Sequence, residues 1–326
     1  MPMLVMILTI YLLAMKMNGK PIIIRPKNHE EWLKAREEGI GASEVSAIVG
    51  LNPWETPFSL WLRKTHQVPP TEENDAMRRG HYLEDAVVQW WMHETGEQVI
   101  KASAADIIYV HPDYPFMRVT PDRIVKGRKK ILEVKSTAIS MGEKIPDYYL
   151  CQVMYQMYVT GIHDAELIYI QGGLTFGRFI VEYDAEFAEF LANKVKEFWT
   201  ENVIGGKEPD AINVSDLAVK VPKSTPDKAI KADATALSQI AEIREKKAQY
   251  DALGKEIDAL TDSLKLFMMD SEALTDESGN VLLTWKSGKD KTSFDSKTFA
   301  AENPELYAKY CKTVPGSRSF LVKKDK

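Results

Sequence analysis

Two runs of β-forming residues joined by a charged turn narrow the possible folds more than any other feature of this sequence. The runs are Met117–Val125 and Ile131–Lys135, and their spacing predicts a β-hairpin. Glu133 and Lys135 are two residues apart in the second strand, so both project from the same face of the sheet. Asp122 lies in the first strand, so the hairpin is expected to bring two carboxylates and an ammonium group together.

Patterns on both sides of the hairpin predict a mixed α/β core. Apolar residues recur at helical spacing in Gly80–Thr95, Ile145–Val159 and Ala185–Asn202. Two further runs, Ala165–Gln171 and Arg178–Tyr183, have the composition of strands. The expected fold class is therefore α/β, a mixed central sheet flanked by helices.

The chain is expected to have five segments. They are an apolar N-terminal extension (1–20), the mixed domain (21–205), a proline-bearing linker (206–230), a helical segment (231–271) and a small α+β tail (272–326). The apolar run Met3–Ala14 is too short to span a bilayer, which takes about 20 apolar residues. We expect it to be a buried strand or an extension upstream of a start at Met15 or Met17, with an amphipathic anchor as the alternative.

The helical segment has the pattern of a coiled coil. Asp233 is placed to cap one long helix that runs to about Asp270. From Tyr250 to Phe267 its apolar residues alternate three and four positions apart, which is the spacing of a coiled-coil seam.

Composition excludes several classes of protein. The 326 residues are 44% apolar and 27% charged, an ordinary globular balance that excludes an intrinsically disordered or collagen-like protein. The two cysteines, Cys151 and Cys311, are too few for a disulfide framework or a cysteine-rich metal site, which fits a reducing cytoplasm. A net charge of −5 argues against coating nucleic acid by bulk charge, although a nuclease needs basic residues only along its groove. The sequence has no Walker loop, dinucleotide fingerprint or Gly-x-Ser-x-Gly motif. It therefore gives little support to nucleotide hydrolysis, hydride transfer or serine-hydrolase chemistry.

Asp122 and Glu133 are the expected ligands of a divalent metal. Carboxylates on adjacent strands supply the hard oxygen donors that Mg²⁺ prefers, and Lys135 is placed to orient or deprotonate a water beside the ion. The alternative is a hairpin with a cross-strand salt bridge and no catalytic role. A second Glu-x-Lys pattern, at Glu245 and Lys247, lies in the predicted coil without a neighbouring strand acid and is not a candidate.

Glu84 and Gln152 are two further candidates on helices. Glu84 falls near the start of a predicted helix and is a possible ligand of a second metal; the alternative is an ordinary first-turn acid favoured by the helix dipole. Gln152 follows the Glu-x-Lys strand and shares a helix face with Tyr155 and Gln156, where it could hydrogen-bond a catalytic water or a ligand carboxylate. A solvated surface glutamine is the alternative for Gln152.

Arg36 and Ser43 lie on either side of a glycine-containing break between two predicted helices. A turn that opens a helix, with an arginine and a hydroxyl nearby, is a suitable site for an anion such as a phosphate. The alternative is that Ser43 only caps the helix that follows it.

Five segments, in this order, resemble the YqaJ-type viral recombinase family, the phage lambda exonuclease-like group within the PD-(D/E)xK nuclease superfamily. They are "AREEGIGASEVSAIVG", "RGHYLEDAV", "VTPDRIV", "ILEVKST" and "YLCQVMYQMYVTG", within residues 28–200. The resemblance implies that the catalytic residues are Glu84, Asp122, Glu133, Lys135 and Gln152. Arg36 and Ser43 match positions that hold the 5′-phosphate end of DNA in lambda-type enzymes. The implied metal ligands are Asp122, Glu133, Glu84 and the carbonyl of Val134.

The resemblance also implies an activity and partners. It implies a restriction-endonuclease-like core that uses Mg²⁺, with Mn²⁺ as a substitute, to hydrolyse DNA from duplex ends in the 5′→3′ direction. It further implies a homo-oligomer that works with a single-strand-annealing protein in phage or prophage recombination, in the cytoplasm of a bacterial host. A structure-selective endonuclease on the same core, or a non-catalytic DNA-end-binding factor, are the alternatives.

Overall fold

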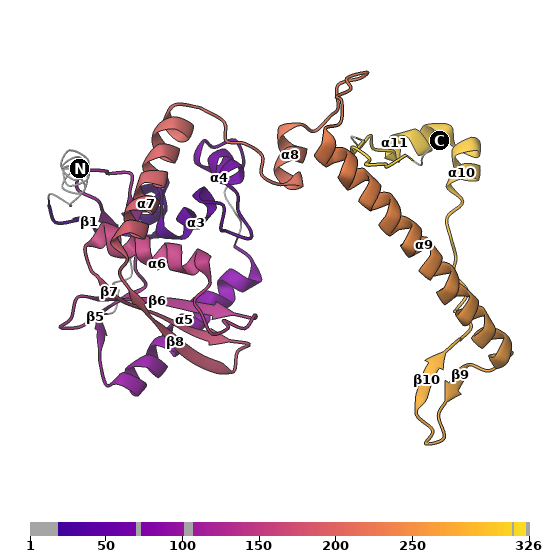
Figure 1. The fold of residues 1–326 in the computed structure, drawn as a ribbon, viewed down its shortest axis with the longest axis horizontal. Coiled ribbons are helices and arrows are strands. Elements are labelled where there is room, and N and C mark those ends of the chain that lie inside the picture. Colours follow the sequence, from indigo (N-terminus) through magenta and orange to yellow (C-terminus); the bar gives the residue numbers. More distant parts are fainter. Residues whose placement is uncertain (1–18, 70–72, 101–106, 315, 324–326) are drawn as a thin grey trace. The chain divides into compact units, whose positions relative to one another are not determined.

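The chain divides into two compact units, Met1–Lys220 and Val221–Lys326 (Figure 1). The computed structural model describes residues 19–69, 73–100, 107–314 and 316–323. The apolar run Met3–Ala14 lies outside these residues, and no described helix is both long and apolar enough to cross a membrane.

The first unit is built on a mixed sheet, as the sequence predicts. In the described part of the chain this sheet has five strands in the order β2-β5-β6-β7-β8. Strands β6 and β7 are parallel, and the other neighbours are antiparallel. The strands are β2 (Val99–Ile100), β5 (Arg123–Val125), β6 (Lys130–Thr137), β7 (Asp164–Gln171) and β8 (Thr175–Glu182).

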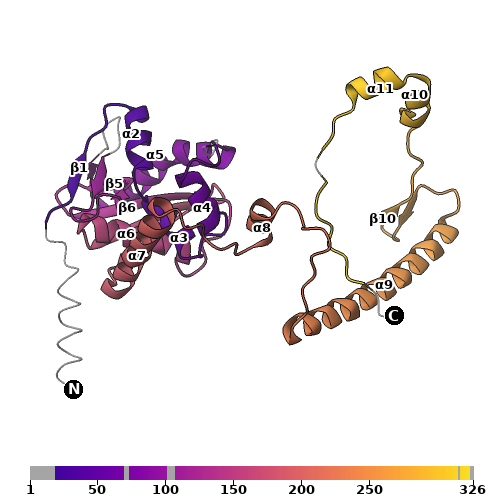
Figure 2. The ribbon, with the colours of Figure 1, turned by 90° about the horizontal axis from the view of Figure 1, so that it is seen from above.

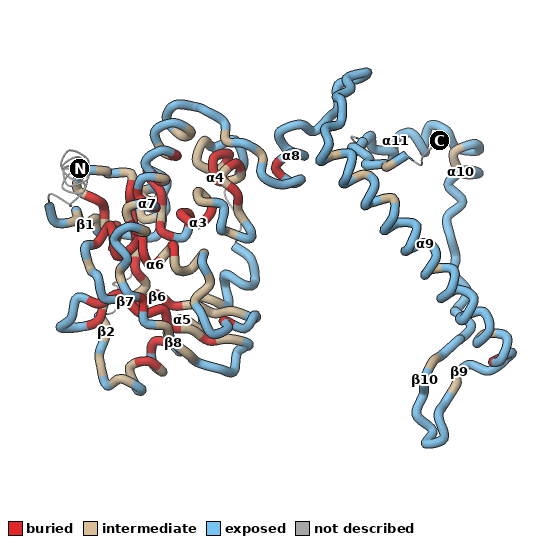
Figure 3. The backbone as a smooth tube through the Cα atoms, viewed as in Figure 1, coloured by how far each residue is buried: buried red, intermediate tan, exposed pale blue. Residues whose placement is uncertain are grey.

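Helices cover both faces of this sheet (Figure 1). On one face, Ile131 of β6 joins a core with α6 (Asp147–Thr160) and α7 (Ala185–Glu197). On the other face, Leu132 and Val134 pack against α5, which spans Asp75–Thr95. Buried residues accordingly concentrate in β6, β7 and the helices next to them (Figure 3). Strand β6 is therefore the centre of the fold, and its alternate side chains belong to different cores.

The remaining described elements of the first unit border this core. A second sheet has the order β1-β3-β4, formed by β1 (Ile22–Ile24), β3 (Ile108–Val110) and β4 (Arg118–Val119). The helices are α2 (His29–Glu37), η1 (Ala42–Glu44), α3 (Val45–Ile48), α4 (Pro57–Lys64), the π-helical η2 (Phe198–Ile204) and α8 (Val214–Lys220).

The structure corrects the strand expected over residues 117–125. That segment forms two short strands in different sheets, β4 with β3 and β5 with β6. The break falls at Thr120, Pro121 and Asp122, where proline has no N–H to donate to a ladder. Asp122 consequently lies in the gap between two strands and not within one, although the hairpin of β5 and β6 forms as expected.

The first unit extends beyond the domain boundary expected at residue 205. Helix α8 lies inside the segment expected to be a linker, residues 206–230. Its Asp216 is buried and accepts a hydrogen bond from the Thr56 hydroxyl at 2.8 Å. A buried carboxylate with a partner in α4's cap ties this helix to the unit.

The second unit contains one long helix and little buried surface. Helix α9 spans Ala234–Met268 without a break (Figure 2), and Asp233 caps it by accepting from the Ala236 amide at 2.7 Å, as predicted. Among the described residues of this unit, Met268 is the only buried one. The other elements are β9 (Ala273–Thr275), β10 (Val281–Thr284), α10 (Ser296–Glu302) and α11 (Pro304–Tyr310).

A chain crossing at Gly39 and Ile40 anchors the segment that leads into η1. The Ile40 amide donates to the Phe116 carbonyl at 2.7 Å, and the Arg118 amide donates to the Ile40 carbonyl at 3.1 Å. A Cβ at position 39 would lie 2.2 Å from the Phe116 carbonyl oxygen, well inside van der Waals contact. Only glycine fits this approach of two backbones.

We therefore expect Gly39→Ala to lower the free energy of unfolding by roughly 3 kcal/mol, because the backbones must separate to admit the methyl group. Gly80→Ala is the matched control: Gly80 lies inside α5 with nothing within 4 Å of an added Cβ, so its replacement should stabilise by about 0.5–1 kcal/mol. Urea unfolding of both variants measures this. Equal stability of the Gly39→Ala variant and the parent would contradict the close contact between the backbones of Gly39 and Phe116.

Candidate active site

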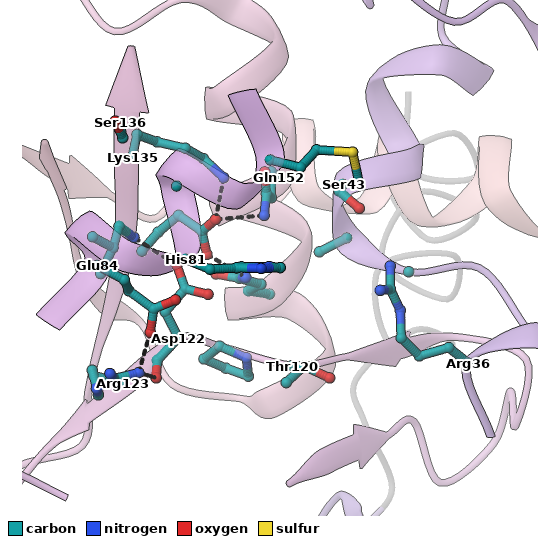
Figure 4. A pocket seen from close by; sticks show the side chains of 18 of the residues that line it. Arg36, Ser43, His81, Glu84, Thr120, Asp122, Arg123, Lys135, Ser136 and Gln152 are labelled. Carbon is teal, nitrogen blue, oxygen red and sulfur yellow. Dashed lines mark hydrogen bonds and ion pairs between the residues drawn. The ribbon is translucent and has the colours of Figure 1, made fainter. Parts of the chain in front are cut away.

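One cavity of about 460 Å³ in the first unit is lined by every side chain expected at the site (Figure 4). These are Arg36, Ser43, Glu84, Asp122, Glu133, Lys135 and Gln152, together with Val134. They come from α2, η1, α5, the gap between β4 and β5, β6 and α6. None of them lies elsewhere in the structure.

Glu133 is the buried centre of this cavity, with 1% of its surface exposed. Its Oε1 accepts hydrogen bonds from Lys135 Nζ and from Gln152 Nε2, both at 2.5 Å. Its Oε2 accepts from Gln156 Nε2 at 2.8 Å. Lys135 therefore lies on the same face as Glu133, as the strand period predicts, and Gln152 points at a carboxylate and not into solvent.

Asp122 lies in the gap between β4 and β5 and is hydrogen-bonded to β6. Its Oδ2 accepts from the Val134 amide at 2.7 Å, which keeps its carboxylate beside that of Glu133. Burial raises the pKa of Asp122 well above its usual value, and the negative charges of Glu133 and Glu84 raise it further. Lys135 opposes this rise without overcoming it.

Glu84 is held in place by an arginine that the sequence analysis did not identify. Arg123 of β5 forms an ion pair with Glu84 (Figure 4). It forms a second one with Asp85 at 2.8 Å. Helix α5 begins at Asp75, capped by Asn74, and not near Gly80 as expected. Glu84 is thus well inside the helix, which rules out the interpretation as a first-turn acid.

The donor set fits a divalent metal of the Mg²⁺ type. Mg²⁺ commonly binds one or two carboxylates and completes its coordination shell with water. Asp122 and Glu133 can supply the two carboxylates, and the cavity leaves room for the water. Burial raises the pKa of Asp122 most and the charge of Glu133 raises it further, and a bound cation would offset both effects. No group of three or more His, Cys, Asp or Glu side chains among the described residues is arranged to hold an ion, and Lys135 and Arg123 pair with Glu133 and Glu84.

Arg36 and Ser43 lie to one side of the cavity, apart from the acidic group (Figure 4). The Arg36 guanidinium stacks on Trp32 one turn earlier, 4.6 Å from the ring centre. Ser43 is an exposed residue of η1 and caps no helix: Gly41 is the N-cap of η1 and Glu44 that of α3. The interpretation of Ser43 as a cap is therefore wrong.

A buried charge cluster fixes the backbone around Ser43. Glu44 accepts from the Gly41 amide at 2.8 Å and forms ion pairs with Lys64 and Arg63, each at 2.8 Å. Burial raises the pKa of Glu44, but Lys64 and Arg63 outweigh that effect and lower it overall. The loop between Arg36 and Ser43 is thus tied to α4, which carries both cations.

Three contributors to the site were missed from the sequence. Gln156 follows Gln152 by one helical turn, so the spacing of two glutamines on one face was an available signal. Arg123 and the ion pairs of Glu44 gave no signal, because their partners lie 39, 19 and 20 positions away in the chain (84 to 123, 44 to 63 and 44 to 64).

The chain belongs to the YqaJ-like viral recombinase family. Residues 31–163 match the model of the YqaJ-like viral recombinase domain. The chain is 32% identical over 309 residues to the uncharacterized protein YqaJ of Bacillus subtilis (strain 168), a match that covers 90% of this chain and 95% of that protein. It is 24% identical over 157 residues to the uncharacterized protein R354 of Acanthamoeba polyphaga mimivirus, covering 43% of this chain and 28% of that protein.

Two solved structures resemble about half of this chain. An alkaline exonuclease (LHK-Exo) from Laribacter hongkongensis is 23% identical, with a TM-score of 0.45, over 53% of this chain and 91% of that one. A phage-related exonuclease from Haemophilus somnus 129PT is 12% identical, with a TM-score of 0.40, over 52% of this chain and 96% of that one. Because both scores are below 0.5, these likenesses do not bear on what this chain does.

The burial of Asp122 and its crowding by other carboxylates predict that Asp122→Asn stabilises the protein in a metal-free buffer. Since the native pKa of Asp122 is raised, the native state binds more protons than the unfolded state, and stability falls as pH rises through that pKa. The asparagine variant should be more stable at pH 8 by on the order of 1 kcal/mol and should lose this part of the pH dependence.

Urea unfolding at pH 5 and pH 8 in the presence of EDTA measures this effect. Glu143→Gln, which removes an exposed carboxylate, is the control and should leave both values unchanged. A less stable Asp122→Asn variant at pH 8 would contradict the electrostatic account.

Proposed function

We propose that this chain is a metal-dependent deoxyribonuclease that degrades linear duplex DNA from its ends in the 5′→3′ direction. The observation that carries the proposal is the single cavity in which an acidic pair, a lysine, a glutamine and an arginine–serine pair all converge. Membership of a viral recombinase family supports DNA as the substrate. The exonuclease and endonuclease alternatives share this chemistry and differ in whether a DNA end is required.

Asp122, Glu133 and the Val134 carbonyl are the proposed ligands of one Mg²⁺, for which Mn²⁺ is the expected substitute. Glu84 is proposed to help hold a second ion. When bound, these ions supply Lewis-acid chemistry, polarising the phosphate and stabilising charge on the leaving oxygen. The protein's part is to keep the two carboxylates buried, adjacent and aligned, which β6 and the Val134 amide do.

Lys135 and Gln152 are proposed to position the attacking water. Both donate to the same oxygen of Glu133, so their donor groups are already fixed at one point of the cavity. Burial lowers the pKa of Lys135, but Glu133 and Asp122 outweigh this and raise it overall. Without bound metal the ammonium group of Lys135 is therefore favoured, and we propose that it orients the water or a phosphate oxygen.

Arg36 and Ser43 are proposed to hold the terminal 5′-phosphate and so to set the direction of digestion. A guanidinium already oriented by stacking on Trp32 can donate two hydrogen bonds to a phosphate with little further ordering. The Ser43 hydroxyl lies on a backbone that Glu44 holds. A single-strand-annealing protein is the proposed partner, since digestion of one strand exposes the other.

Substitution at the acidic centre should abolish digestion. Glu133→Gln and Lys135→Met preserve side-chain shape and should each lower the rate of nucleotide release from end-labelled linear duplex by about 100-fold or more. Removal of Mg²⁺ with EDTA should stop the parent, and Mn²⁺ should restore it. Glu245→Ala, in the second Glu-x-Lys pattern, is the matched control and should retain full activity.

Full activity in the Glu133→Gln and Lys135→Met variants would refute the assigned site. Circular dichroism of each variant distinguishes lost chemistry from lost folding. Rapid cleavage of covalently closed circles by the parent would favour the structure-selective endonuclease, because an end-dependent enzyme spares them. Tight binding of DNA ends without any hydrolysis would favour the non-catalytic alternative.

The 5′-phosphate assignment predicts a preference between two substrates. Linear duplex with a 5′-phosphate should be digested faster than the same duplex with a 5′-hydroxyl, and Arg36→Gln should reduce this preference by about 10- to 100-fold, the effect of a lost charged hydrogen bond. Lys34→Gln, an exposed cation of the same helix, is the control. An unchanged preference in the Arg36→Gln variant would remove Arg36 from this role.

A further inference from the structure

Trp54, in the loop between α3 and α4, is a large aromatic side chain that the fold leaves in solvent. Of the seven tryptophans, all in the described part of the chain, it is the most exposed, at 71%. A tryptophan is usually largely buried, because its ring carries much apolar surface. Single exposed apolar residues are nevertheless common, so the loop that carries Trp54 and the groups beside it decide what the ring can do.

The loop of Trp54 is held by hydrogen bonds on both sides of the ring. The side-chain oxygen of Asn52 accepts from the amides of Trp54 and Glu55, at 2.8 and 3.0 Å. The side-chain amide of Asn52 in turn donates to the Ser46 hydroxyl at 3.2 Å. Glu55 forms an ion pair with Arg63 of α4 at 2.9 Å. The indole is thus exposed on a fixed backbone, so little conformational freedom is lost when a ligand covers it.

A row of aromatic rings, Trp54, Tyr148 and Tyr149, joins this loop to the candidate active site. The Tyr148 ring lies edge-on to the indole, with ring centres 5.2 Å apart and planes at 83°. The Tyr149 ring centre lies 4.3 Å from that of Tyr148 and 5.2 Å from Nζ of Lys135. Lys135 lines the cavity, whereas the three rings lie outside its lining. The aromatic row therefore starts at the edge of the cavity and reaches the surface at Trp54.

We propose that Trp54 stacks on an unpaired base of the DNA strand whose phosphate occupies the cavity, an inference that rests on the proposed nuclease function. A strand bound in the cavity continues past its edge, where the aromatic row begins at Lys135. Bases of any sequence stack on aromatic side chains, because every base has a π face. In the interior of a duplex neighbouring bases cover both faces, so such a base must leave the stack to lie on an indole. The expected ligand of Trp54 is therefore the face of an unpaired base and not the charged backbone.

The size of the aromatic row favours a base over a protein partner. A stable protein interface covers about 800 Å² on each side. Tyr148 and Tyr149 are half-buried, so the exposed surface of the row is mainly the single indole of Trp54. One ring of this size matches one base.

Binding of single strands that differ only in their bases tests this subsite. The probe is a 5′-phosphorylated deoxythymidine strand of about 12 nucleotides with a 3′-fluorescein, compared with an abasic strand of the same length. Fluorescence anisotropy with the full-length protein in EDTA gives both dissociation constants without digestion. Trp54→Ala should weaken binding of the base-containing strand at least about fivefold, the lower end of what one stacked base contributes, and leave binding of the abasic strand unchanged.

Two variants show whether the effect comes from the indole. Trp54→Phe keeps a π face and should bind the base-containing strand within about twofold of the parent. Phe190→Ala, which removes a 48% exposed ring of α7, should change neither dissociation constant.

An equal loss for both strands in the Trp54→Ala variant, or no loss for either, would overturn the proposal. A parent protein that binds both strands equally, or neither, would overturn it as well. Binding in EDTA does not require digestion, so failure of this subsite is distinguishable from failure of the proposed nuclease activity.

Discussion

The site of the first unit depends on the hydrogen bonds that the buried carboxylate of Glu133 accepts. A carboxylate with 1% exposure is costly unless its oxygens are paired, and Glu133 receives Lys135, Gln152 and Gln156 as donors. The strand period places Lys135 beside it, and a helical turn places the two glutamines one above the other. One buried charge thus fixes the relative position of β6 and α6 and orients the groups proposed to act on water.

The same arrangement leaves an electrostatic cost that the protein alone does not remove. Asp122 stays beside Glu133 because the Val134 amide holds it, and its pKa rises as a result of burial and of the neighbouring acids. A fold optimised for stability alone would place an amide or an apolar group here. A divalent cation bound between Asp122 and Glu133 would offset their negative charge. The energetic penalty of placing them together is therefore explained by the proposed chemistry.

Local patterns predicted the parts of the structure that depend on period. The hairpin of β5 and β6, the shared face of Glu133 and Lys135, and the long helix α9 follow from spacing alone. The break at Pro121 was available in the sequence but was overridden by the apolar run around it. The pairing of Arg123 with Glu84, and of Glu44 with Lys64, could not be predicted because it joins elements whose packing is set by the tertiary fold.

The two Glu-x-Lys patterns of this chain show why a motif needs a backbone to acquire chemistry. In β6, residues two apart lie on one face, so Glu133 and Lys135 meet at 2.5 Å in a buried cavity. In α9, residues two apart point to different sides of the helix, and both Glu245 and Lys247 are exposed. The strand therefore concentrates charge in a buried cavity, whereas the helix leaves its charges in solvent, where they cannot form a buried reaction centre.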